Sequence, residues 1–178
     1  MLEGEENLIQ QAKEGDATCF GRLYDHYMSR IYRFIVLKVA TKAEAEDLAH
    51  EVFTKAWRNM PRYTFQGFPF SSWLYQIARH QVIDYYRVKK EHQSLENANE
   101  EALSVAATLD QDTDLALSVG RVKLAIKKLN SDQQDVILMR FVDDLSHREI
   151  AKAMKKSEGA VRLIQHRAIH ELKKILQA

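Results

Sequence analysis

The chain has 178 residues, enough for one ordinary domain or two small ones, each with a modest core. With 46% hydrophobic and 29% charged residues and only 6 Gly and 2 Pro, the composition favours helical structure and excludes collagen-like and disordered chains. The single cysteine, Cys19, excludes an intramolecular disulfide and a set of cysteine metal ligands, and it fits a reducing compartment. The acidic N-terminus and the lack of a long apolar run exclude a signal peptide and membrane insertion, so we expect a cytoplasmic protein.

Charge is unevenly distributed along the chain, although the formal net charge is only +1. Seven acids and no Lys or Arg lie between Glu91 and Ser118, which leaves 26 bases against 18 acids elsewhere. Two basic bodies joined by an acidic connector are typical of two domains that face nucleic acid. A solvated acidic linker between ordinary domains would have the same charge pattern.

The first two predicted helices follow from apolar spacing and capping signals. Apolar residues recur at steps of three and four from Phe20 to Ile35, which predicts a long amphipathic helix from Asp16 onward. Thr41 and Glu44 have the spacing of a capping box, so a second helix is expected to begin there.

An aromatic loop is predicted after the second helix, which ends before Pro61. Residues 59–72 contain both prolines and a glycine among aromatic side chains, and this combination interrupts a helix. Helical spacing resumes at Ser72, where a third helix begins. Tyr63 and Phe65 are expected to be exposed and able to stack on unpaired bases, whereas Trp73 is expected in the core.

The acidic stretch from Glu91 to Asp112 has weak periodicity and few large apolar residues, so we interpret it as a tether. Helical spacing returns from Leu115 to Leu129. Ser131 and Gln134 are then expected to cap the next helix, and the remaining residues of this half predict a further helix pair.

That pair has the spacing of a helix-turn-helix. Ser146 and Glu149 cap a short helix, and a last helix begins near Ser157, with the small Ala151 and apolar Val161 positioned for a close crossing. Residues 145–178 carry eight bases against three acids, which suits a phosphate backbone. A plain helical hairpin with a solvated basic face is the alternative. The turn lacks Gly, so a lysine is expected in the left-handed conformation.

No signature of catalysis or of a cofactor is found in the sequence. His166 and His170 have the spacing of a helical metal pair, but no carboxylate or cysteine joins them and the helix is basic. The sequence contains no phosphate-binding glycine loop, nucleophile elbow or zinc-protease motif. We therefore expect a protein that is not an enzyme, with no cofactor and no metal.

Three segments, taken in order, resemble the extracytoplasmic-function sigma factors of bacterial RNA polymerase. They are DLAHEVFTKAW (Asp47 to Trp57), FSSWLYQIARHQVIDYYR (Phe70 to Arg87) and LSHREIAKAMKKSEGAVRLIQHRAIHELKKIL (Leu145 to Leu176). The resemblance implies an all-α fold with a sigma-two domain over residues 1–90, an acidic linker over 91–115 and a sigma-four domain over 116–178. It also implies that the chain directs transcription initiation.

The resemblance assigns three sets of site residues. The surface that docks the polymerase clamp helices would contain Asp47, Leu48, His50, Glu51 and Phe53, with His50 standing where the family usually has Gln. The minus-ten element would flip a base into the loop of residues 60–68 and would be bound by Tyr63, Phe65, Gln76, Arg79, His80, Asp84 and Arg87. Relatives often have Arg and Asn or Thr where this chain has Gln76 and His80, so its preferred minus-ten sequence can differ.

The minus-thirty-five element would be bound by Arg148, Ser157, Glu158, Ala160, Arg162, Leu163, His166 and Arg167. Among these, Arg162 is the base-reading candidate, because a bidentate Arg on guanine is the commonest specific contact. Arg148 and Arg167 are expected to hold phosphates.

The partners implied by the resemblance are core RNA polymerase, through its clamp helices and flap, promoter DNA, and an anti-sigma factor that covers the polymerase-binding surfaces. The acidic linker would be threaded through the polymerase toward its RNA exit path. Two other functions are compatible with the residues. A conventional helix-turn-helix regulator would bind specific DNA without polymerase, and an adaptor that binds only proteins would leave the basic face from Arg148 to Lys174 unused.

Overall fold

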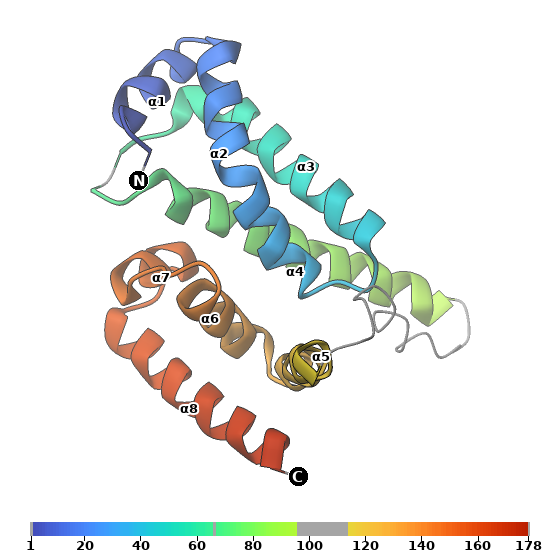
Figure 1. Cartoon of the computed structure of the whole chain (residues 1–178). Helices are drawn as coiled ribbons and strands as arrows, with labels where there is room; N and C mark the ends of the chain where they lie inside the picture. Colours follow the sequence, from blue (N-terminus) through green and yellow to red (C-terminus); the bar gives the residue numbers. More distant parts are fainter. Residues whose placement is uncertain (1, 66, 96–113, 178) are drawn as a thin grey trace.

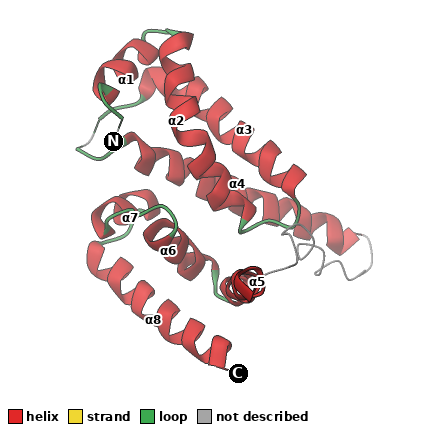
Figure 2. Ribbon diagram, viewed as in Figure 1, coloured by secondary structure: helices red, strands yellow, loops and turns green. Residues whose placement is uncertain are grey.

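The computed structural model describes residues 2–65, 67–95 and 114–177, and within these residues it is entirely helical (Figure 2). The all-α fold predicted from the sequence is therefore confirmed. No helix among the described residues is both long and apolar enough to cross a membrane. The predicted linker lies largely in residues 96–113, outside the described residues.

The N-terminal unit contains helices α1 (Glu5–Lys13), α2 (Ala17–Val36), α3 (Lys42–Asn59) and α4 (Phe70–Leu95), with a short 3-10 turn, η1 (Met60–Arg62), after α3. In Figure 1, α2, α3 and α4 form an elongated bundle and α1 lies at one end of it. The apolar spacing did not predict α1. This helix has only 9 residues, and it buries Leu8, Ile9 and Ala12 against the bundle.

The predicted helices of this unit begin where the sequence indicated, except for a small shift at α4, and local hydrogen bonds cap α2 and α3. Asp16 caps α2 by accepting from the backbone N–H groups of Thr18 and Cys19 at 2.8 and 3.1 Å. The reciprocal bonds of the predicted capping box between Thr41 and Glu44 are both present. Helix α4 begins at Phe70, slightly before the predicted Ser72.

The C-terminal unit contains α5 (Asp114–Lys127), α6 (Ser131–Phe141), α7 (His147–Met154) and α8 (Glu158–Gln177). The predicted cap of α6 is wrong by one residue. The box is formed by Asn130 and Gln133, whose side chains and backbones exchange bonds of 3.0 and 3.1 Å. Asn is as good an N-cap as Ser, and Gln134 is thereby free to donate to the carbonyl of Leu129 instead.

Helices α7 and α8 form the predicted helix-turn-helix. Ser146 and Glu149 cap α7, and Ala151 and Val161 are both buried where the two helices cross. The turn between them uses Lys155 in the left-handed conformation, with φ 53° and ψ 44°. A lysine was expected to adopt this conformation, because no glycine stands in the turn.

The two units pack against each other. Figure 1 shows α6 and α7 alongside the middle and the N-terminal end of α4, and a single cluster of buried apolar residues includes side chains from both units. The helices reach further into the predicted linker than expected, since α4 ends at Leu95 and α5 begins at Asp114. The surfaces of α4 and α7 that face each other carry several of the predicted site residues.

Candidate nucleic-acid interface

Helix α8 presents a row of polar and basic side chains from its N-terminal half. The exposed side chains are those of Glu158, Arg162, Leu163, His166 and Arg167. Arg162 lies 3.7 Å from Glu158, and both side chains are largely exposed, so this ion pair is weak and easily exchanged. Because residues three and four apart share one face of a helix, these side chains form a continuous surface.

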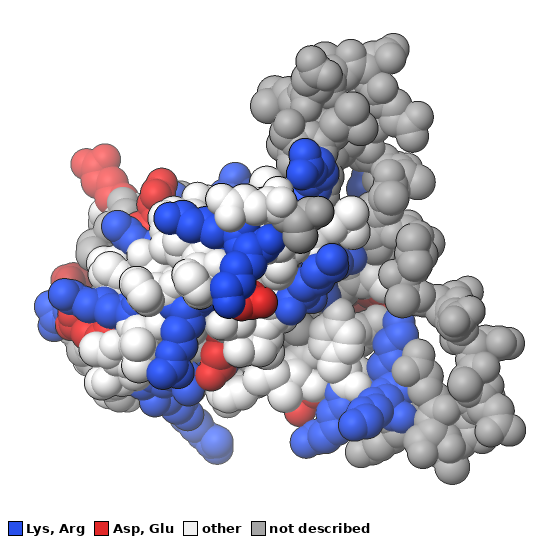
Figure 3. Space-filling view, turned by 90° about the horizontal axis from the view of Figure 1, so that it is seen from below, with Lys and Arg blue, Asp and Glu red and all other residues white. Residues whose placement is uncertain are grey.

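The other residues of the helix-turn-helix that were predicted to bind DNA contribute unequally to this surface. Ser157 caps α8 by accepting from the backbone N–H of Ala160, and Ala160 is half-buried. Arg148 is exposed on α7, but its guanidinium lies 5.0 Å from the centre of the Phe68 ring in the N-terminal unit. The structure thus groups the predicted residues of α8 and places Arg148 at the boundary between the units. Figure 3 shows the molecule from below, and on this face Lys and Arg side chains are spread widely, with fewer Asp and Glu between them.

The aromatic loop is more buried than the sequence suggested. Phe65 is 54% exposed, as expected, but Tyr63 is only 8% exposed, and the expectation for Tyr63 is wrong. Its ring packs against Trp73 and Phe70 at centroid distances of 4.8 and 5.5 Å. Burial raises the pKa of Tyr63 to about 12, with the Glu5 carboxylate adding to the shift. Trp73, expected in the core, is half-buried and packs against it.

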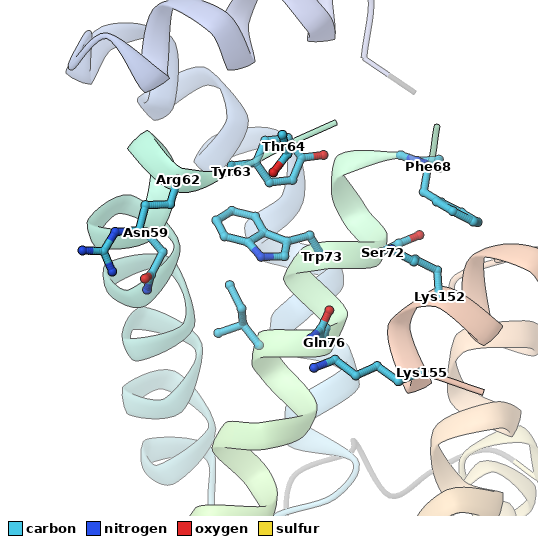
Figure 4. A pocket seen from close by; sticks show the side chains of 12 residues that line it. Asn59, Arg62, Tyr63, Thr64, Phe68, Ser72, Trp73, Gln76, Lys152 and Lys155 are labelled. Atoms are coloured by element: carbon cyan, nitrogen blue, oxygen red, sulfur yellow. The ribbon is translucent and has the colours of Figure 1, made fainter. Parts of the chain in front are cut away.

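A cavity of about 460 Å³ lies beside this loop. Figure 4 shows Trp73 and Gln76 of α4 on one side of it, with Lys152 of α7 and Lys155 of the following turn on the other. The hydroxyl of Ser72 also lines the cavity, and it is buried without a hydrogen-bond partner. Aromatic, amide and hydroxyl groups around one hollow suit a planar base with polar edges.

A second hollow of about 420 Å³ adjoins the first and shares Phe68, Gln76, Lys152 and Lys155 with it. The ammonium group of Lys152 lies 5.1 Å from the centre of the Phe68 ring, close to where Arg148 lies. The loop of the N-terminal unit and the first helix of the helix-turn-helix are therefore neighbours in this structure.

Arg79, expected to face DNA, is only 9% exposed. Its Nε atom donates to Asp135 Oδ2 at 2.5 Å and a terminal nitrogen donates to Asp132 Oδ1 at 2.9 Å, both acids being in α6. Lys38, which follows α2, donates to the other oxygen of Asp135. The expected DNA contact of Arg79 is thus replaced here by carboxylates of the C-terminal unit.

The other predicted residues of α4 are more accessible. His80 and Arg87 are exposed, Asp84 and Gln76 are half-buried, and Arg87 pairs with Asp84 at 3.2 Å. Tyr86 donates to the backbone carbonyl of Lys38, which holds the segment after α2 against α4.

The residues of α3 predicted to dock the polymerase are accessible, with one exception. Asp47, His50 and Glu51 are exposed and Leu48 is half-buried, but Phe53 is only 2% exposed. Phe53 packs edge-on against Tyr24 with ring centroids 4.8 Å apart, so it supports the helix from within and does not belong to the surface. The Tyr24 hydroxyl also lies 3.2 Å from His50 Nδ1.

Three polar residues at the boundary between the units were not predicted: Lys38, Asp135 and Asp143. The one available signal was an acid next to the apolar run from Val136 to Met139, since a buried charge requires a partner. The side chain of Asp143 is fully buried, 3.5 Å from Arg33. Burial raises the pKa of Asp143, and the opposing effects of the Tyr75 hydroxyl and Arg33 offset only part of the shift. Among the described residues, no group of His, Cys, Asp and Glu is placed to hold a metal ion.

Comparison with known proteins identifies both units. The model of sigma-70 region 2 matches residues 23–92, and that of sigma-70 region 4 matches residues 125–174. The ECF RNA polymerase sigma factor BldN of Streptomyces coelicolor is 37% identical, with 95% of this chain covered and 64% of BldN. The ECF RNA polymerase sigma factor SigW of Bacillus subtilis is 32% identical, with 95% of each chain covered.

Two solved structures share the fold. One is CnrH in complex with the cytosolic domain of CnrY, with 21% identity, a TM-score of 0.76 and coverage of 98% of this chain and 97% of the other. The second is the sigma factor RpoE in complex with the anti-sigma factor NepR from Bartonella quintana, with 21% identity, a TM-score of 0.73, and coverage of 89% and 97%. The two matched regions, and relatives that align with nearly the whole chain, show that it belongs to the ECF sigma factors of the sigma-70 family. These proteins are non-enzymatic subunits of RNA polymerase for transcription initiation.

Proposed function

We propose that this sigma factor binds core polymerase through the exposed face of α3 and recognises two promoter elements with its two units. Helix α8 reads the minus-thirty-five element as duplex DNA, and the cavity beside the aromatic loop takes a base of the melted minus-ten strand. The row of exposed side chains on α8, directly after a capped helix and a tight turn, is the observation that carries this proposal.

The minus-ten assignment is supported by the residues that line the cavity. The Trp73 ring can stack on a flipped base, and the amide groups of Asn59 and Gln76 can form hydrogen bonds with it. Arg62 adds a cation at the rim that suits the backbone of a single strand. Tyr63 also lines the cavity, and its largely buried ring packs against Trp73.

The docking assignment is supported by the exposed acids of α3, Asp47 and Glu51, with Leu48 between them. Glu51 accepts a hydrogen bond from Gln81 of α4, which orients its carboxylate. This face would meet the polymerase clamp helices, and the C-terminal unit would meet the flap. An anti-sigma factor that covers these surfaces in the cytoplasm completes the proposal, in line with the anti-sigma factor NepR that is bound to RpoE in one of the solved structures.

Run-off transcription with core RNA polymerase tests the proposal on genomic promoter fragments, including one from upstream of this chain's own gene. New discrete transcripts that require the protein are expected, and they should be lost in a double variant with Asp47→Ala and Glu51→Ala. Replacing Glu14, an exposed acid at the C-terminal end of α1, is the matched control and should leave them intact. Binding of specific duplexes by the protein alone, without any effect on polymerase, would instead identify a conventional regulator.

A further inference from the structure

The buried ion cluster between the units gathers charges from three elements. Asp135 of α6 is completely buried, and its two carboxylate oxygens accept from Lys38 and from Arg79 of α4. Lys38 and Arg79 are themselves only 6% and 9% exposed. The second acid, Asp132, is partly exposed and binds both Arg79 and Lys156. Two cations of the N-terminal unit thus bind acids that come only from the C-terminal unit.

This cluster makes the packing of the units depend on one carboxylate. A buried ion pair gains little net stability, but removing one partner is strongly destabilising because an uncompensated charge remains in the interior. Loss of Asp135 would leave Lys38 and Arg79 buried next to each other, and water can reach them only if the units separate. Desolvation by burial lowers the pKa of Lys38 despite the attraction of Asp135, so its cation is better solvated outside this contact.

Arg79 is one helical turn from the cavity proposed for the minus-ten base, and Lys38 shares the carboxylate of Asp135 with Arg79. Gln76 lines that cavity and stands three residues before Arg79 on α4, so the two side chains share a helix face. A strand with one base in the cavity would bring its backbone phosphates to this face. Arg and Lys donors that converge on two oxygens of a carboxylate can bind two oxygens of a phosphate in the same manner.

The C-terminal unit therefore covers both parts of this surface at once. Its α6 acids bind Lys38 and Arg79, and Lys152 of α7 and Lys155 of the following turn line the cavity. Arg79 cannot donate the same N–H groups to Asp135 and to a phosphate, so the two occupants exclude each other.

We propose that Lys38 and Arg79 form one anion site with two alternating occupants, the Asp135 carboxylate while the units are packed and a phosphate group of the minus-ten strand after they separate. This inference rests on the proposed function of the cavity. It adds Lys38 to the DNA-binding residues and makes Asp135 an internal competitor of promoter DNA.

The first test uses the full-length protein without polymerase. Asp135→Asn is expected to increase the radius of gyration in small-angle X-ray scattering, and to raise affinity for a single-stranded minus-ten oligonucleotide about tenfold, because the competent form is no longer rare. The control is Asp144→Asn, which makes the same charge change at an exposed position with φ 55°, where Asn is well tolerated. Circular dichroism verifies that each variant keeps its helices. Unchanged affinity and size for a folded Asp135→Asn variant would overturn the competition.

A second measurement needs no variant. Saturating oligonucleotide should increase the radius of gyration of the wild-type protein, whereas binding without any separation of the units would contradict the exchange of occupants.

The third test examines the phosphate in the holoenzyme. Lys38→Met should weaken promoter binding and make the slope of log affinity against log salt shallower by about one, as expected for one lost phosphate contact. Asp135→Asn should leave holoenzyme transcription unchanged. An unaltered salt slope for Lys38→Met would refute the phosphate occupant while wild-type transcription still supports the sigma function. Absence of any transcript with the wild-type protein would refute that function instead.

Discussion

Glu5 of α1 is expected to stabilise the loop beside the minus-ten cavity. Its replacement should lower the free energy of unfolding more than is usual for an acid near the N-terminus. The side chain is 4% exposed and accepts from the Tyr27 hydroxyl at 2.5 Å and from the backbone N–H of Phe70 at 3.2 Å. Phe70 is the first residue of α4, so Glu5 joins three elements next to the loop. Burial, together with Glu5, raises the pKa of Tyr27, so the hydroxyl remains the donor.

The magnitude follows from the two buried donors that Glu5→Ala would leave without an acceptor. Each unsatisfied buried group costs ~1–3 kcal/mol, so we expect a loss of about 3 kcal/mol in the free energy of unfolding. For a chain of this length that loss corresponds to a fall in Tm of roughly 6–12 °C. Affinity for the minus-ten oligonucleotide should fall as well, because the backbone that begins α4 is no longer fixed.

Thermal and urea unfolding measure the effect, with Glu6→Ala as the control. Glu6 is exposed in the same first turn of α1, where its carboxylate interacts favourably with the helix dipole, an effect of about 0.3–1 kcal/mol. A Glu5→Ala variant no less stable than Glu6→Ala would mean that the two buried donors find other partners, which contradicts the structural role of Glu5.

Further predictions concern the two DNA-binding sites and the packing of the units. Arg162→Ala should cost about 1–3 kcal/mol in promoter binding and relax the base preference at one minus-thirty-five position, whereas Arg167→Ala should weaken binding to all sequences evenly and reduce the salt slope by about one. Fluorescence anisotropy with single-base promoter variants distinguishes the two. If Arg162→Ala weakened binding equally for all sequences, Arg162 would be rejected as the base reader. Trp73→Ala should lower affinity for the minus-ten oligonucleotide by about 1–3 kcal/mol, while an unchanged titration would remove the ring from the site. Because burial raises the pKa of Asp143 above its ordinary 3.8, the packed form binds a proton more tightly than the separated form; packing should weaken as pH rises from 3.8 through the raised value. Asp143→Asn should abolish that dependence in scattering and favour packing at neutral pH, and an identical pH profile in the variant would contradict the assignment.

Short-range features of the fold could be predicted from the sequence because they depend on residues within one helical turn. The capping boxes of α3 and α7 join residues three apart, and they are present as predicted. The surface of α8 is equally local, since helical periodicity alone decides which side chains share a face. The left-handed Lys155 was expected because the turn lacks glycine.

Other local features were wrong or missing because the sequence allows more than one solution. Asn130 and Ser131 are both good caps, and only the backbone of the preceding segment decides between them. Tyr63 and Phe65 are aromatic residues of one loop, and Tyr63 is buried because the rings of Phe70 and Trp73 lie within reach. The short α1 lacks the length to form a clear apolar stripe and is stabilised mainly by packing.

The sequence was sufficient to predict the helices other than α1, the two units, the acidic connector between them and the basic face of α8, since each depends on composition or on neighbours along the chain. Which charges pair across the two units depends on how the units pack. Lys38 and Asp135 are 97 positions apart, and Arg79 and Asp135 are 56 apart. No periodicity relates such residues, and a surface cation has the same sequence signature whether it faces DNA or a carboxylate. Whether Arg79 is open to a promoter is therefore decided by how the units pack, because burying one acid between them requires both cations as its partners.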